Sequence, residues 1–105
     1  MVQQISLARQ FLGLTTRIEC SLRPLNDDSG RWMIVFAAGV SDHQPTSVQA
    51  QGPFYGANEA LMMLKNVVDN LLRMDYSFDK SPFIWSLHAH AELKKVAQKA
   101  RCALS

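Results

Sequence analysis

The sequence predicts one α+β domain, in which an antiparallel sheet of three or four strands packs against two or three helices. Two neighbouring apolar segments, residues 14–23 and 32–40, have the spacing of a β-hairpin, and a third short segment follows at residues 46–51. The strongest helical pattern comes after these segments, at residues 58–74. Runs of strands followed by helices are typical of α+β proteins. The chain has 105 residues, which fits a single domain over residues 1–105.

The N-terminal segment, residues 2–12, is expected to form a short helix. Its apolar residues share a helical spacing: Ile5, Leu7, Ala8, Phe11 and Leu12. Gly13 follows, and glycine commonly ends helices. The expected element order is therefore α-β-β-β-α-(β)-α.

The next two segments are expected to form a hairpin whose strands differ in burial. Residues 14–23 alternate between apolar and polar side chains, which predicts a strand with one buried face and one wet face carrying Arg17 and Glu19. Residues 32–40 are apolar on both faces, so this strand needs cover on both sides. A helix of the same chain, a second copy or a partner would each supply that cover. Residues 24–30, which are rich in turn formers, connect the two strands.

A third strand and a long helix are expected to follow. Residues 46–51 alternate weakly, and Gly52-Pro53 should end this strand or place it at an edge, because proline lacks a ladder donor. Asn58 is a plausible N-cap of the helix over residues 58–74, and Glu59 suits its positive end. The apolar stripe of this helix repeats every three or four residues: Ala60, Leu61, Leu64, Val67, Val68, Leu71 and Leu72.

The C-terminal part has two interpretations. Ser81-Pro82 is a good helix start, which favours one helix over residues 82–104. Alternation at residues 83–88 would instead give a fourth strand, with a helix beginning near Ala89. The single helix is preferred. In both cases the buried stripe of the last helix is Leu93, Val96, Ala97, Ala100 and Leu104.

Composition excludes several classes of protein. With 48% hydrophobic and 19% charged residues, the chain is not expected to be disordered. No apolar run approaches the ~18 residues of a membrane span, and no signal peptide is visible, so we expect a soluble cytoplasmic protein, of bacterial origin by its size. Cys20 and Cys102 are too far apart in sequence for a zinc finger or a disulfide framework, so both are expected to be reduced.

No group of residues predicts an enzyme. His43, His88 and His90 lack the further ligands that a metal site needs. Asp42-His43 is interpreted as part of a turn rather than as an acid–base pair. The segment from Gly52 to Gly56 lacks the dense glycine and the lysine of phosphate-binding loops. We therefore expect no catalytic activity, no metal and no cofactor.

Apolar residues around the long helix point instead to contact with other proteins. Methionine and aromatic side chains are favoured at interfaces, and five of them are predicted as partner-binding anchors: Met62, Met63, Tyr76, Phe78 and Trp85. Since most oligomers are symmetric, the expected function is a small binding or regulatory module that acts as a homodimer.

The alternative is a nucleic-acid-binding accessory factor. The net charge is only +2, and the basic excess lies on the last helix, at Lys94, Lys95, Lys99 and Arg101. Contacts of such residues with phosphates would give affinity that falls steeply with salt.

Overall fold

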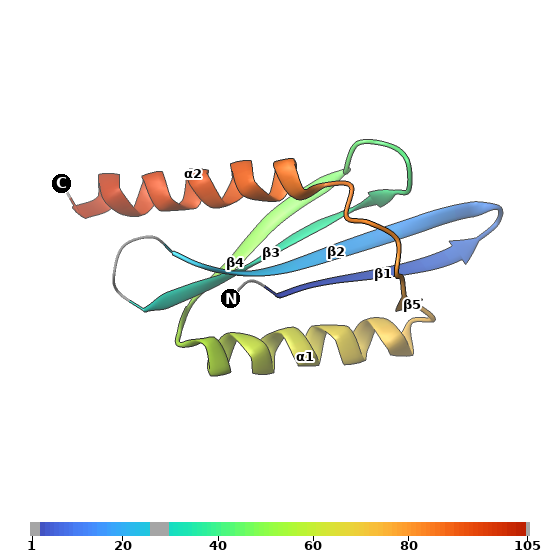
Figure 1. Cartoon of the computed structure of the whole chain (residues 1–105), viewed down its shortest axis with the longest axis horizontal. Helices are drawn as coiled ribbons and strands as arrows, with labels where there is room; N and C mark the ends of the chain where they lie inside the picture. Colours follow the sequence, from blue (N-terminus) through green and yellow to red (C-terminus); the bar gives the residue numbers. More distant parts are fainter. Residues whose placement is uncertain (1–2, 26–29, 105) are drawn as a thin grey trace.

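One antiparallel sheet lies between two helices in the computed structural model, which describes residues 3–25 and 30–104, with side chains for 4–25 and 30–96 (Figure 1). The described elements are β1 (Gln3–Phe11), β2 (Leu14–Pro24), β3 (Arg31–Val40), β4 (Ser47–Tyr55), α1 (Ala57–Arg73), β5 (Ser77–Phe78) and α2 (Ser86–Leu104). The strands are ordered β4-β3-β2-β1-β5, and all neighbours are antiparallel. The α+β class is confirmed, with five strands and two helices in the described part of the chain.

The helix expected at residues 2–12 is wrong, because this segment forms strand β1 within the described residues. Ile5, Leu7 and Arg9 alternate with smaller neighbours, and the whole strand pairs with β2, from Gln3 opposite Leu22 to Phe11 opposite Leu14. A helix of this length is marginal alone, so pairing with β2 decides the conformation. Val2 lies outside the described residues.

The wet face expected on β2 is also wrong. Arg17 and Glu19 are only 2% and 4% exposed. The segment between β5 and α2 crosses this face, and α2 packs over β3 and β4 beside it (Figure 1). The same cover buries the second face of β3, at Met33, Val35 and Ala37. A helix of the same chain therefore supplies the cover that the apolar strand β3 was expected to need on its second face.

The core between the sheet and α1 follows the expected stripes. Its buried residues come from β1, β2, β3 and α1: Leu7, Cys20, Leu22, Ile34, Ala60, Leu64 and Val68. The helix expected at residues 58–74 is confirmed to within one residue at each end. Its N-cap is Gly56 rather than Asn58, and that cap makes no side-chain hydrogen bond.

The remaining boundaries differ from expectation. Strand β4 does not end at Gly52-Pro53 but continues to Tyr55, with a register shift opposite Trp32 and Ile34. Pro53 is tolerated because β4 is an edge strand. Residues 83–88 are not a strand, and the last helix begins at Ser86 rather than Pro82. Leu93 and Val96 are half-buried. The rest of the stripe predicted for this helix, and most of the turn over residues 24–30, lie outside the described side chains. No helix among the described residues is long and apolar enough to cross a membrane.

Candidate functional site

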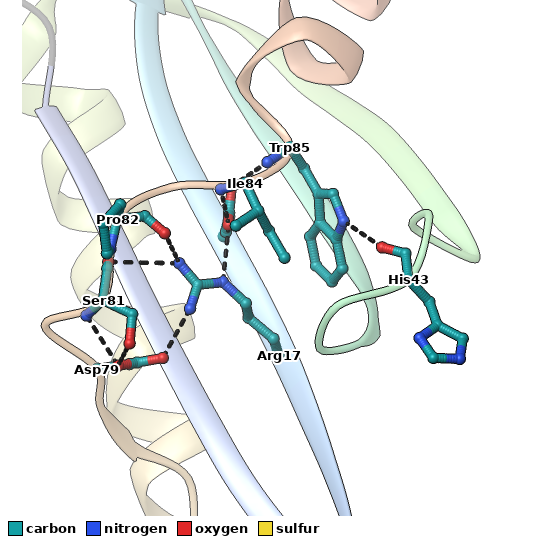
Figure 2. A network of polar contacts seen from close by, with 8 residues as sticks. Arg17, His43, Asp79, Ser81, Pro82, Ile84 and Trp85 are labelled. Carbon is teal, nitrogen blue, oxygen red and sulfur yellow. Dashed lines mark hydrogen bonds and ion pairs between the residues drawn. The ribbon is translucent and has the colours of Figure 1, made fainter.

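A buried polar cluster joins β2 to the segment that leads into α2 (Figure 2). The Arg17 guanidinium donates hydrogen bonds to Glu19 Oε2 at 2.7 Å, to Asp79 Oδ2 at 2.7 Å and to the Pro82 carbonyl at 2.8 Å. The Glu19 carboxylate also accepts from the backbone N–H groups of Ile84 and Trp85, at 2.9 and 3.1 Å. We call Arg17, Glu19 and Asp79 the Arg17 cluster.

The Arg17 cluster holds the chain together rather than a substrate. Both oxygens of Glu19 are already occupied by donors of the same chain. Hydrogen bonds from the backbone N–H and hydroxyl of Ser81 lower the pKa of Asp79, and the charge of Arg17 lowers it further. A buried ion pair with satisfied hydrogen bonds needs no ligand. Its arrangement fixes residues 79–85 across the sheet and so positions the start of α2.

Cys20 lies on the other face of β2, fully buried against α1. Burial, together with a smaller effect of the charge of Glu19, raises the pKa of its thiol to about 12. Since only the thiolate is nucleophilic, Cys20 is expected to resist thiol reagents at mildly alkaline pH. The test is titration with a disulfide reagent in a Cys102→Ser variant, native and in concentrated urea. We expect labelling only after unfolding, and fast labelling of the native protein would contradict this burial.

The β1–β2 hairpin projects past the ends of the other strands (Figure 1). Its tip carries exposed apolar residues. Phe11 and Leu14 are exposed and lie opposite each other in the ladder. Leu12, in the two-residue turn between them, is 87% exposed. Three large apolar side chains therefore point into solvent where a hairpin usually carries polar residues.

The backbone makes Leu12 more unusual still. Leu12 and Gly13 have φ of 52° and 80°. A two-residue hairpin turn with both φ positive favours Asn-Gly, because leucine is sterically disfavoured in the left-handed region. At this position leucine gains neither burial nor a favourable conformation. Folding alone does not explain it, and an exposed, strained residue is a reason to consider function.

A hollow of about 580 Å³ lies beside this tip, between β1 and the connection that carries β5. Phe11 and Phe78 both line it. Arg9 donates a hydrogen bond to the Met74 carbonyl at 3.1 Å, and its guanidinium lies 4.9 Å from the centre of the Tyr76 ring, which ties β1 to this connection. We call Phe11, Leu12, Leu14 and Phe78 the apolar tip.

The five predicted anchors do not gather on one surface. Phe78 belongs to the apolar tip, and Tyr76 is half-buried under Arg9. Met62 is 70% exposed on the polar outer face of α1, near the helix start, with the partly exposed Met63 beside it. That start lies at the opposite end of the molecule from β5 (Figure 1). Trp85 is buried on the far face of the sheet and donates to the His43 carbonyl, so its side chain is not on the free surface (Figure 2).

The other candidate residues are dispersed as well. Lys94 and Lys95 are exposed on α2, while the side chains of Lys99 and Arg101 lie outside the described residues. His43 and His88 both line a hollow of about 310 Å³, but His90 is not among its lining residues. In the described part of the chain, no group of three or more His, Cys, Asp or Glu side chains is placed to hold a metal ion.

Apart from Phe78, the residues of the apolar tip were not predicted as a site, because residues 2–12 were expected to form a helix. A usable signal was present in the alternation on both sides of Leu12-Gly13, which indicates a tight hairpin.

These features define a small α+β domain with a sheet between two helices, one internal ion-pair cluster and one exposed apolar end. A family model described as PA4575-like protein matches residues 1–105, so the chain belongs to the PA4575-like protein family. No curated protein and no solved structure matches the chain.

Proposed function

We propose that this protein is a small binding or regulatory module that acts through protein–protein contact, without catalysis, and that the apolar tip is its docking surface. The observation that carries the proposal is Leu12, which is 87% exposed at a φ of 52°. Its conformation costs about 1–2 kcal/mol relative to a residue suited to this region. That cost is understandable if Leu12 is buried when a partner binds.

The shape of the tip supports the same function. Phe11 and Leu14 flank Leu12 on the hairpin, and Phe78 borders the adjoining hollow of about 580 Å³. Clustered apolar anchors beside a pocket are the arrangement that concentrates binding energy in protein interfaces. Because pairing between β1 and β2 holds the hairpin, its backbone is fixed before binding, which lowers the entropic cost.

The test is a Leu12→Asn variant, in which a folding role and a docking role predict opposite results. Asparagine suits the left-handed region, so the free energy of unfolding should stay the same or rise by about 1 kcal/mol. Partner affinity should fall at least about tenfold, because a central anchor is lost. We would compare proteins captured from lysate of the native host by quantitative mass spectrometry and then measure the affinity of each purified partner.

Met62→Asn is the matched control, since Met62 is also an exposed apolar residue but lies on α1. It should capture the same proteins as the wild type. Capture that is unchanged by Leu12→Asn would rule out the tip, and equal losses in both variants would argue against a localised docking surface.

A further inference from the structure

Strand β4 forms one edge of the sheet, and no described strand pairs with its outer side. Residues 47–51 form a regular ladder with β3, from Ser47 opposite Ala38 to Gln51 opposite Ile34. The register shift and Pro53 are confined to the following part of the strand. Alternate residues of this five-residue part of β4 therefore present main-chain N–H and C=O groups outwards, in the geometry that another strand would need.

Residues 47–51 of this edge lack the protection that the opposite edge has. Natural sheets guard free edges with charged residues, proline, β-bulges, short strands or covering segments, and on β4 the proline and the register shift lie only after residue 51. At the opposite edge, the two-residue strand β5 covers part of β1, and Arg9, Asp75 and Asp79 lie beside it. Around β4, by contrast, the sequence has no Asp, Glu, Lys or Arg between Asp42 and Glu59.

We propose that residues 47–51 of β4 pair antiparallel with the same residues of a second copy of this chain, about a two-fold axis at Gln49. In this register Val48 lies opposite the second copy's Ala50, and Ser47 lies opposite its Gln51. Gln49 is the middle of the regular ladder, and this choice leaves Pro53 outside the new pairing. The sheets of the two copies then join into one.

The absence of charge is the argument for a second copy as the occupant. The two-fold axis places Gln49 opposite Gln49 of the second copy and keeps Val48 and Ala50 diagonal to their own copies, so a charged residue at these positions would be repelled by its copy. Neutral glutamine, serine, valine and alanine avoid this repulsion. A partner of different sequence would place no such restriction on β4 and would be better recognised through complementary charge.

The apolar layer of the sheet supports the same pairing. Val48 and Ala50 are half-buried, and their ladder neighbours Ala37 and Val35 are buried under α2. The layer of apolar side chains under α2 therefore extends from β3 to β4 and stops at the edge of the sheet. Pairing of Val48 of each copy with Ala50 of the other copy would continue this layer across the axis. The exposed Gln49 side chains of the two copies would meet on the other face of the sheet, where their amides can hydrogen-bond to each other.

The interface is small, so the dimer should dissociate on dilution. A five-residue ladder with its flanking side chains buries less than the ~800 Å² per partner of a standard interface. Sedimentation velocity over a wide concentration range is the suitable measurement. We expect the wild type to move from the monomer mass of 11.8 kDa towards twice that mass as concentration rises.

The decisive test uses opposite charges at one position, in Gln49→Lys and Gln49→Glu variants. Each alone should remain monomeric, because like charges would face each other across the axis. An equimolar mixture should recover the dimer mass, because Lys and Glu then pair. Asn66→Lys, on the exposed face of α1, is the matched control and should dimerise like the wild type. Circular dichroism would confirm that each variant is folded.

Three results would overturn the proposal: a wild type that is monomeric at every concentration, dimers in both separate Gln49 variants, or a mixture that stays monomeric. The apolar tip is intact in all of these proteins, so each result leaves the docking proposal standing. A dimer that is lost in Leu12→Asn and kept in both Gln49 variants would place self-association at the tip instead.

Discussion

Replacing Glu19 with alanine is expected to lower the free energy of unfolding by about 3–5 kcal/mol, which is the usual cost of removing one partner from a buried ion pair. The Arg17 guanidinium, which is 2% exposed, would then keep only Asp79 of its two counter-charges. The backbone N–H groups of Ile84 and Trp85 would lose their acceptor in the same step. Since small domains are stabilised by only about 5–15 kcal/mol, much of the protein should be unfolded at moderate urea concentration.

Urea denaturation followed by circular dichroism is the measurement, and Asp69→Ala is the control. Asp69 is also acidic but lies on the exposed face of α1, so its removal should change stability by no more than about 0.5 kcal/mol. Equal stability changes in the two variants would show that Glu19 is not buried as the structure describes.

The wet face predicted for β2 shows what a period of two can and cannot indicate. Alternation correctly separates the side chains of β2 into two faces, one with Ile18 and Cys20 and the other with Arg17 and Glu19. It does not reveal what covers each face. The cover comes from residues more than sixty positions away, at Asp79 and Trp85, and the sequence gives no local pattern that pairs them with β2.

The helix predicted for β1 has a different cause. The apolar residues at Ile5, Leu7 and Phe11 fit both a helical stripe and a strand face, because short segments satisfy both periods. Pairing with β2 decides between them, and that pairing depends on the two-residue turn at Leu12-Gly13. The prediction took Gly13 as a helix end, whereas it is the second residue of a hairpin turn.

Features set by local sequence were predicted well. Helix α1 has an apolar stripe over several turns, and the β2–β3 pair combines two long apolar segments with a polar turn between them. The apolar tip was predicted only in part, at Phe78. Its other members became visible once β1 was placed, because exposure of Leu12 is a property of the fold rather than of the residue type.

The two exposed surfaces are compatible with each other. The apolar tip belongs to the β1–β2 hairpin and β5, whereas the free edge is β4, on the other side of β3. A dimer formed through β4 would leave both hairpin tips uncovered, so one assembly would present two docking surfaces. Two linked surfaces can raise the apparent affinity for a multivalent partner without any new contact.

Replacing Trp85 with alanine is expected to destabilise the fold by about 3–5 kcal/mol, as is usual for truncation of a buried tryptophan. The side chain is 2% exposed, and its indole N–H donates to the His43 carbonyl at 2.8 Å. Its loss would open a cavity at the start of α2 and remove the contact that holds the loop after β3. Trp85→Phe should cost less than Trp85→Ala, because phenylalanine keeps most of the packing and the exposed His43 carbonyl region can hydrogen-bond with water.

Leu87→Ala is the matched control, since Leu87 is a large apolar residue two positions further along and is 85% exposed. Its effect on the denaturation midpoint should be within about 0.5 kcal/mol. The same variants separate a core role of Trp85 from the partner-anchor role expected from its residue type. A core role predicts a loss of stability and, for the fraction that remains folded, an unchanged oligomeric mass. If Trp85→Ala instead kept its stability and lost partner binding or the dimer, the tryptophan would have to lie on the surface, and the position of α2 against the sheet would be wrong.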